Sequence, residues 1–226
     1  MGTLYLVRHG QASFGEDDYD RLSPLGHQQA HRLGEYLRQR FEREGVRIDS
    51  VLMGSLTRHR ETWEGMARGA GWTHAPAVWP GLNEYDSEAL IHAIHPAPLA
   101  KPDTPELYRQ HFRLLRDALR AWMDGRTRPQ GMPSYADFVG GIEAALDHVR
   151  QQCTGNALIV SSGGPISTAV GRVLGTPAET TIELNLRIRN TALTEFAFTP
   201  KRHMLVSYNA LPHLDSAEHQ GWVTYA

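Results

Sequence analysis

The chain of 226 residues contains one cysteine, Cys153, and this scarcity excludes two kinds of structure. No intramolecular disulfide can form and no cluster of thiolates can bind a metal, so a reducing compartment is expected. Long apolar runs are also missing. The run Leu4 to Val7 is too short for a signal-peptide core, and no segment reaches a membrane-spanning length. We therefore expect a cytoplasmic protein with no membrane partner.

The chain also lacks an excess of charge of either sign. Its 23 Lys and Arg and 25 Asp and Glu residues give a formal net charge of −2, so nothing favours a nucleic acid as a partner. No glycine-rich loop ends in Gly-Lys-Ser or Gly-Lys-Thr, which excludes a P-loop nucleotide site. The composition is otherwise typical of a globular protein, and the length suits a single domain, residues 1–226.

Short apolar runs alternate with helix signals along the chain. Strands are predicted at 3–7, 48–53 and 156–160, and a hairpin at 193–198 and 204–208. Capping residues and apolar periodicity predict helices at 24–44, 56–70, 105–122, 135–149 and 166–174, with a tight turn at 161–165. This alternation predicts an α/β fold with a mostly parallel sheet covered on both faces and one antiparallel edge strand from the hairpin.

The periodic pattern breaks in one long stretch after the second helix. Residues 75–105 are rich in proline, and one short helix is expected near residues 87–95. We interpret residues 75–133 as an inserted loop and helix cap region over one end of the sheet, within the single domain. Any selectivity for a substrate is expected to come from this region.

Three predicted strands deliver polar residues to one edge of the sheet. Residues 8–10 follow the first strand, residues 55–58 follow the second, and residues 161–164 follow the third. Ligands of such folds bind at the carboxyl ends of the strands. Arg8 and Arg58 can each donate two hydrogen bonds to a phosphate or carboxylate, and the Gly163-Gly164 pair can present backbone N–H groups. The pattern predicts an anion site.

His9 and Glu84 add chemistry to that site. Cations near His9 disfavour its protonated form, so the imidazole is expected to be neutral and nucleophilic. A neutral imidazole facing a bound phosphate can attack phosphorus and carry it as phosphohistidine. The leaving alcohol then needs a proton, and Glu84, in the loop "GLNEYD", is the candidate donor.

Six motifs occur in an order that resembles one known family. They are "LYLVRHGQA", "LSPLGHQQAHRLGEYL", "SLTRHRETW", "LNEYD", "LIVSSGGPIS" and "SYNALPHL". Together they resemble the histidine phosphatase superfamily, in its phosphoglycerate mutase-like branch, over nearly the whole chain. The resemblance implies a three-layer α/β/α sandwich, a small phosphorylated substrate, and no metal or organic cofactor.

The same resemblance implies roles for individual residues. His9 looks like the phosphorylated nucleophile and Glu84 like the proton donor. Arg8 and Arg58 look like the phosphate clamp, and the backbone at Gly163 is similar to the amide that cradles the phosphate. The adjoining Gly10 and Ser162 are assigned with them to substrate binding, as is His213, which matches a family position of its own.

Three positions depart from the family pattern. Ser162 stands where a second catalytic histidine is usual, and losing such a donor costs ~3 kcal/mol, on the order of a hundredfold in rate. On this basis Ser162→His is expected to raise turnover. Ala12 and Gly15 replace further phosphate donors, which weakens an assignment as a phosphoglycerate mutase. His59, beside Arg58, is interpreted as a helix residue that points away from the clamp.

The same residues also admit other interpretations. A serine hydrolase is excluded because Val160 replaces the first glycine of the nucleophile-elbow motif around Ser162. His27 and His31 have helical metal-site spacing but no carboxylate pair, so they are assigned to the surface. The remaining alternatives are a non-catalytic, phosphate-binding regulatory protein of the same fold, and a mutase. Because His9 and Glu84 are both present, a phosphatase with slower or altered chemistry is favoured.

Overall fold

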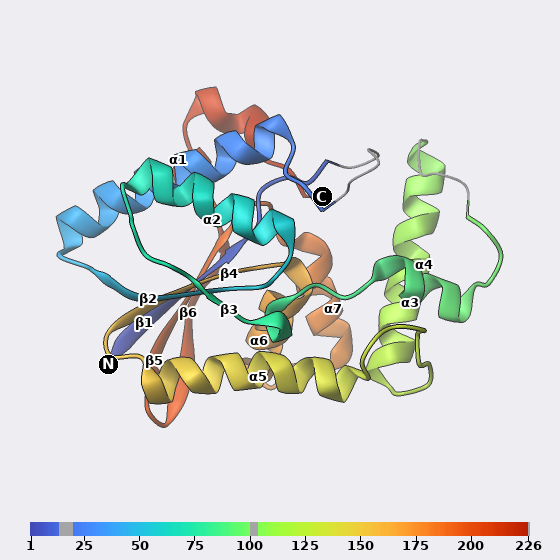
Figure 1. Ribbon diagram of the computed structural model, residues 1–226. Helices are drawn as coiled ribbons and strands as arrows, with labels where there is room; N and C mark the ends of the chain where they lie inside the picture. Colours follow the sequence, from blue (N-terminus) through green and yellow to red (C-terminus); the bar gives the residue numbers. More distant parts are fainter. Residues whose placement is uncertain (14–19, 100–103, 226) are drawn as a thin grey trace.

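The computed structural model describes residues 1–13, 20–99 and 104–225, and within them six strands form one sheet in the order β3-β2-β4-β1-β5-β6. The strands are β1 (Gly2–Arg8), β2 (Ile48–Met53), β3 (Ala77–Val78), β4 (Asn156–Ser161), β5 (Leu193–Thr199) and β6 (Arg202–Ala210). Strands β3, β2, β4 and β1 pair in parallel, whereas β5 is antiparallel to both β1 and β6. The predicted mostly parallel sheet is confirmed, and the strand that runs against the others lies one position in from the edge (Figure 1).

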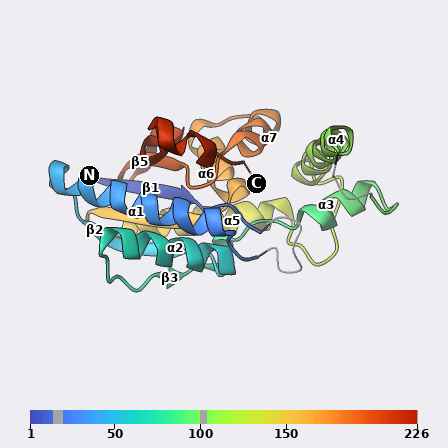
Figure 2. The same cartoon turned by 90° about the horizontal axis from the view of Figure 1, so that it is seen from above.

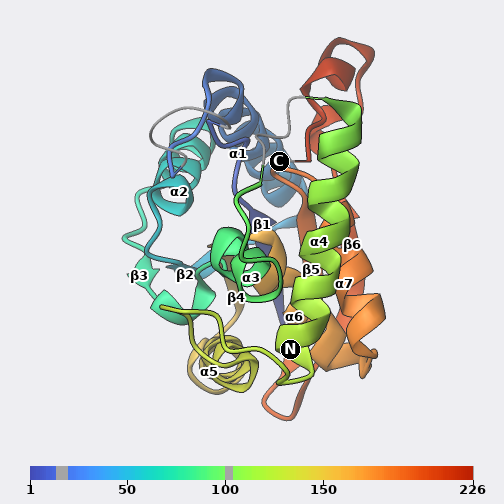
Figure 3. The same ribbon diagram turned by 90° about the vertical axis from the view of Figure 1, so that its right-hand side faces the viewer.

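Helices cover both faces of this sheet. They are α1 (Pro24–Glu44), α2 (Thr57–Ala70), α3 (Ser87–Ile94), α4 (Pro105–Met123), α5 (Tyr135–Gln152), α6 (Gly163–Leu174) and α7 (Ala178–Arg187), with 3-10 turns at Pro80–Leu82, Pro212–Leu214 and Ala217–Trp222. Helices α1 and α2 lie side by side on one face, and α5 and α6 lie on the other (Figures 1 and 3). The result is the expected three-layer α/β/α sandwich.

The strand period of two divides the core into two halves. In β1, Leu4 and Leu6 point into the core beneath α5 and α6, whereas Tyr5 and Val7 point into the core beneath α1 and α2. All four side chains are buried. Because both faces of β1 are apolar, the strand reads as one continuous hydrophobic run, as is typical of a parallel sheet covered on both sides.

Helix boundaries follow the capping residues where the sequence has them. The side chains of Ser23, Thr104 and Ser134 accept hydrogen bonds from backbone N–H groups in the first turns of α1, α4 and α5. Gly45 ends α1 in the left-handed conformation, with φ of 64°, and Gly175 ends α6 in the same way with φ of 68°. These predicted boundaries are confirmed.

Two elements differ from the prediction. Helix α6 begins at Gly163, so the predicted turn at 161–165 is wrong and the glycine pair forms the first turn of the helix. Helix α7 was not predicted. Its buried side chains are only those of Thr181 and Ile182, and so few apolar positions produce no clear periodic signal.

Helices α3 and α4 lie beyond the carboxyl ends of the parallel strands, apart from the two helical layers (Figures 1 and 2). They contact each other, and α4 also contacts α7. Figure 3 shows α4 standing in front of this end of the sheet. A cap role for residues 75–133 stays a prediction. In the part of the chain that the structure describes, no helix is long and apolar enough to cross a membrane.

Candidate active site

His9 follows directly after β1, and its backbone and ring are both fixed. Its N–H donates to the Ser161 carbonyl at 2.9 Å, and its carbonyl accepts from the Asn190 side chain and the Thr191 N–H, each at 3.2 Å. The ring is 4% exposed, and its Nδ1 lies 2.7 Å from the Gly10 carbonyl oxygen. A carbonyl only accepts, so Nδ1 carries the proton and a neutral ring keeps its lone pair on Nε2.

The surroundings of His9 also keep it neutral. Burial lowers the pKa of His9 well below its ordinary value, and the positive charges of Arg58 and Arg8 lower this pKa further. His59 acts in the same direction. Protonation state and tautomer together leave Nε2 as an unprotonated nitrogen, which is what nucleophilic attack requires.

The two arginines reach the site from different elements. Arg8, at the end of β1, donates from Nη1 to the carbonyls of Ile188 and Tyr225. Arg58, in the first turn of α2, donates from Nη1 to Asp20 Oδ1 at 2.7 Å. Asp20 Oδ2 accepts from the backbone N–H of Thr57 at 2.8 Å, so this carboxylate positions both the helix terminus and the guanidinium.

A single cavity brings the predicted residues together. It has a volume of about 2020 Å³, and Arg8, His9, Arg58, Glu84 and Gly163 all line it. The further wall consists of side chains from α3, α4 and the loop that follows α4. The expected convergence of the imidazole and both guanidinium groups on one cavity is therefore present in the structure.

Glu84 is half-buried in the loop after the Pro80–Leu82 turn. Its Oε2 accepts from the Gly164 N–H at 3.1 Å, and its Oε1 accepts from the Tyr85 N–H at 3.3 Å. Burial raises the pKa of Glu84 above its ordinary value, and this effect outweighs the opposing effects of the hydrogen bonds, Arg58 and Arg8. A carboxyl group with a raised pKa is suited to donate a proton.

The glycine pair at the start of α6 is required by close contacts. A Cβ atom at Gly164 would overlap the Glu84 carboxylate and the Tyr85 ring. A Cβ at Gly163 would lie 2.8 Å from the side-chain oxygen of Asn185 and 3.8 Å from Nε of Arg8. Gly163 thus lies beside the Arg8 guanidinium at the positive end of a helix, where an anion is stabilised.

The other predicted substrate-binding residues do not line the cavity. Gly10 donates its N–H to Thr62 Oγ1 at 3.0 Å and packs closely against the backbone of α1 at Gly26. His213 is 1% exposed, and its Nε2 lies 2.9 Å from Thr191 Oγ1. It supports the loop that holds the His9 carbonyl. Ser162 is likewise fully buried beneath the cavity wall.

His59 does not line the cavity that holds the clamp, and its side chain points into the core. Its side chain is 0% exposed, and its Nε2 lies 2.7 Å from Ser162 Oγ. The ring centroids of His59 and His9 are 5.9 Å apart. Burial, together with the positive charge of Arg58, lowers the pKa of His59 to about 3, so this ring is neutral as well.

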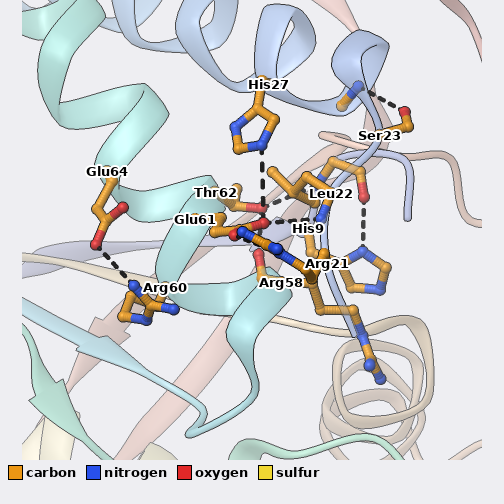
Figure 4. Close-up of polar contacts among 12 residues, drawn as sticks. His9, Arg21, Leu22, Ser23, His27, Arg58, Arg60, Glu61, Thr62 and Glu64 are labelled. Carbon is orange, nitrogen blue, oxygen red and sulfur yellow. Dashed lines mark hydrogen bonds and ion pairs between the residues drawn. The ribbon is translucent and has the colours of Figure 1, made fainter. Parts of the chain in front are cut away.

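Several supporting residues were not anticipated from the sequence. Thr62 accepts from Gly10 and donates to the Arg58 carbonyl at 2.6 Å, which links α2 to the loop after β1. The buried carboxylate of Glu61 accepts from the Leu22 N–H at 2.8 Å (Figure 4). Acidic and hydroxyl residues on a helix give no local signal of such distant partners.

The remaining predictions concern metals and departures from the family pattern. His27 lies 3.8 Å from Glu61, and His31 lies 3.6 Å from Glu35. Over residues 1–13, 20–99 and 104–225, no group of three or more His, Cys, Asp and Glu side chains is placed to hold a metal ion. Ala12 is buried in an isolated bridge with Leu22. Gly15 lies outside the described residues.

Comparison with known proteins identifies the family. The chain is 27% identical, over 99% of its length and 91% of the relative's, to a protein of Photorhabdus laumondii named "Probable phosphoglycerate mutase". A phosphoserine phosphatase of Entamoeba histolytica, solved with 3-phosphoglyceric acid, is 21% identical with a TM-score of 0.65, over 95% of this chain and 100% of the other. A mycobacterial glucosyl-3-phosphoglycerate phosphatase complexed with VO3 is also 21% identical with a TM-score of 0.65, over 93% and 100% of the two chains. The profile of the histidine phosphatase superfamily (branch 1) matches residues 4–211, and the chain therefore belongs to this superfamily.

Proposed function

We propose that this chain is a phosphatase that hydrolyses a small phosphomonoester through a phosphohistidine at His9. The observation that carries the proposal is the state of this ring: neutral, protonated on Nδ1, and held in a cavity that Arg8, Arg58 and Glu84 also line. The relatives named as phosphatases of phosphoserine and of glucosyl-3-phosphoglycerate support a phosphorylated small molecule as the substrate.

In the first half-reaction, the substrate phosphate lies between the two guanidinium groups and the Gly163 N–H. Nε2 of His9 donates its lone pair to phosphorus, and the bond from phosphorus to the ester oxygen breaks. Glu84 transfers its carboxyl proton to that oxygen, so the product leaves as a neutral alcohol and Glu84 becomes a carboxylate. The cationic groups stabilise the charge on the phosphoryl oxygens throughout.

In the second half-reaction, water replaces the alcohol. The Glu84 carboxylate takes a proton from this water as its oxygen attacks phosphorus, and the bond from Nε2 to phosphorus breaks. Inorganic phosphate leaves, His9 regains its lone pair, and Glu84 regains its proton. Each residue thus returns to its starting state, and no further reactant is needed.

Hydrolysis fits the cavity better than phosphoryl transfer within one molecule. A mutase must keep water from the phosphohistidine while the substrate reorients, whereas a cavity of about 2020 Å³ leaves room for water once the alcohol has left. A non-catalytic phosphate-binding protein would need the arginines, but it would have no use for an unprotonated Nε2 in one cavity with a carboxyl group whose pKa is raised. We therefore place hydrolysis ahead of both alternatives.

The cavity wall supports an anionic substrate. Three exposed arginines, Arg113, Arg128 and Arg187, line it beyond the clamp and form no ion pair with any residue in the described ranges. Their charge favours entry of anions by long-range attraction. Cytoplasmic location is part of the same proposal, because phosphorylated metabolites are abundant there and Cys153 needs no oxidising compartment.

One experiment tests this function directly. Hydrolysis of p-nitrophenyl phosphate is compared for the wild type and His9→Ala from about pH 5 to about pH 8. The wild type should release nitrophenol and form an acid-labile phosphoenzyme with a labelled substrate, whereas His9→Ala should do neither. A matched control is His203→Ala, a half-buried histidine on β6 away from the cavity, which should retain activity. Equal rates for the wild type and His9→Ala would refute the proposal.

A further inference from the structure

We infer that His59 and Ser162 act as a pair, in which His59 orients the Ser162 hydroxyl so that it donates a hydrogen bond to the phosphoryl group on His9. This inference rests on the proposed function and deepens it. It assigns to His59 a positioning role, and it supplies a donor at the end of β4, where the sequence carries no histidine.

The geometry places the pair next to the nucleophile. In the parallel pairing of β1 with β4, Arg8 lies opposite Ser161, so His9 and Ser162 are the next residues along neighbouring strand ends. Ser162 also precedes Gly163, which lines the cavity beside Arg8. His59 Nε2 lies 2.7 Å from Ser162 Oγ, a normal hydrogen-bond distance.

The His59 ring packs against Gly54, where the absence of a side chain leaves room for it. A Cβ atom at Gly54, just after β2, would overlap Nδ1 of this ring, so any larger residue there would displace it. The ring is completely buried and lies across from His9, with the two ring centroids 5.9 Å apart. Burial of a polar ring is costly unless the ring forms a hydrogen bond, so a ring that is completely buried is expected to have a hydrogen-bond partner.

The direction of the hydrogen bond follows from the surroundings of the two ring nitrogens. His59 Nδ1 lies against the backbone of Gly54, which raises the pKa of His59, but no hydrogen bond of normal geometry forms there. Ser162 Oγ, at 2.7 Å from Nε2, is the better placed partner for the ring proton. The Nε2–H form is favoured for this reason.

This tautomer determines what Ser162 can do. Its oxygen accepts from His59, so its own hydrogen is available for another acceptor. Ser162 is the N-cap residue of α6, yet its side chain makes no capping hydrogen bond to that helix. The hydroxyl hydrogen is thus not used by the local structure, and a phosphoryl oxygen on His9 is the acceptor that we assign to it.

A purely structural role for His59, as a residue that fills the core, makes different predictions. It predicts loss of stability on substitution, with the turnover of the folded fraction unchanged. The pair predicts loss of kcat with little change in KM, because the donor acts on the charge that develops at phosphorus. The pair also predicts the tautomer of the His59 ring, whereas a role in packing alone predicts no particular tautomer.

The first test does not depend on activity. Nitrogen-15 NMR of the labelled wild type near neutral pH reports which nitrogen of a neutral histidine carries hydrogen, and His59→Phe identifies the His59 signals. We expect the Nε2–H form for His59 and the Nδ1–H form for His9. A proton on Nδ1 of His59 would overturn the inference, because Ser162 would then have to donate to the ring.

The second test is kinetic and uses shape-matched variants. His59→Phe keeps the ring but removes the donor, and it should lower kcat by about tenfold to hundredfold, as should Ser162→Ala. The double variant should be no slower than the slower single variant, because the two residues act as one unit. His59→Gln keeps an N–H at a similar reach and should stay within about threefold of the wild type. His203→Gln is the matched control on β6 and should retain wild-type kcat.

The pair also reverses the expectation for Ser162→His. An imidazole at residue 162 needs the volume that the His59 ring occupies, so Ser162→His alone should lower kcat, and the combination with His59→Ala should restore much of it. Wild-type kcat in His59→Phe, or losses that multiply in the double variant, would refute the pair alone. No turnover by the wild type would instead refute the proposed function.

Discussion

Replacement of Glu84 by glutamine tests the proposed proton donor with little change in shape. The two carboxyl oxygens accept from the N–H groups of Gly164 and Tyr85 at 3.1 Å and 3.3 Å, whereas glutamine has a single acceptor oxygen and keeps one of these hydrogen bonds. Glutamine also has no acidic proton to give. A loss of rate that depends on the leaving group should therefore report proton transfer to the leaving oxygen.

The size of the effect should depend on the leaving group. General acid catalysis contributes about 10²- to 10⁴-fold, so hydrolysis of an alkyl phosphate should slow by that factor in Glu84→Gln. Nitrophenolate leaves readily without a proton, so p-nitrophenyl phosphate should lose much less in the first half-reaction. A burst of nitrophenol would then precede slow turnover, because water still lacks its base in the second half-reaction.

The pH dependence follows from two shifted pKa values with opposite signs. Activity needs neutral His9, which is lost only on acidification because burial and the arginines lower its pKa. It also needs protonated Glu84, which is lost as the pH rises through a pKa that burial has raised above 4.5. The wild type should be most active on the acid side of neutrality, and Glu84→Gln should lose the alkaline decline.

The substitution Glu84→Gln should raise the stability of the protein although it lowers the activity. The folded-state pKa of Glu84 is raised, so the folded protein favours the uncharged carboxyl, and this contribution to stability is lost as the pH rises through the folded pKa. Glutamine is uncharged at every pH. Glu84→Gln should thus melt at a higher temperature than the wild type at neutral pH, and the difference should shrink on acidification.

Two measurements decide this prediction: steady-state rates with an alkyl and an aryl phosphate, and thermal melts at several pH values. A variant that slows both substrates equally, without a burst, would contradict a role in protonating the leaving group. A variant that melts below the wild type at neutral pH would show that the folded protein favours the charged form of Glu84, and the assignment of a raised pKa would be wrong.

Further predictions concern the supports of the site and the core. Gly164→Ala should displace the Glu84 carboxyl and lower kcat for alkyl phosphates as much as Glu84→Gln does. Its matched control is Gly140→Ala, on the exposed side of α5 with no atom within 4 Å, which should raise stability by about 0.5–1 kcal/mol in thermal melts. Thr62→Val removes the acceptor of the Gly10 N–H and should cost about 1–3 kcal/mol in urea titrations, since a buried donor is left unpaired. Ile159→Ala, in the central strand β4 with 0% exposure, should cost about 2–5 kcal/mol in the same titrations, and a smaller loss would contradict its burial.

The layers of the fold were predictable because the determining signals are local. The apolar run in β1, the serine cap of α1 and the glycine that ends it each lie within a few residues of the feature that they specify. The nucleophile and the clamp were predictable for a related reason. Parallel strands deliver residues 8–10 and 161–164 to the same edge by topology alone.

The environment of His59 was not predictable, because its partner is 103 residues away. Sequence spacing within α2 suggested only that residues 58 and 59 point in different directions. It did not show that the end of β4 lies beneath α2, so that the side chain of residue 59 points into the core and reaches Ser162. Glu61 and Thr62 were missed in the same way, since each meets a partner on the loop before α1 or after β1.

The start of α6 was mispredicted because glycine is a poor helix former and the sequence has two in succession. Contacts across the fold outweigh that local preference. The Glu84 carboxylate approaches Gly164, and the Asn185 side chain approaches Gly163, so closely that a Cβ atom at either position would collide with them. In a single sequence, a glycine that is required because no Cβ atom fits cannot be distinguished from a glycine in a turn.

The hydrogen bond from Arg8 to the Tyr225 carbonyl joins two residues that are 217 positions apart in the sequence. Thr224 adds a second link, because its carbonyl accepts from the Asn190 N–H beside the His9 loop. A nascent chain on the ribosome can therefore hold its imidazole and one guanidinium in place only after residues 224–225 have emerged. Chains that stop before residue 224 should accordingly be poor at capturing cellular phosphate esters.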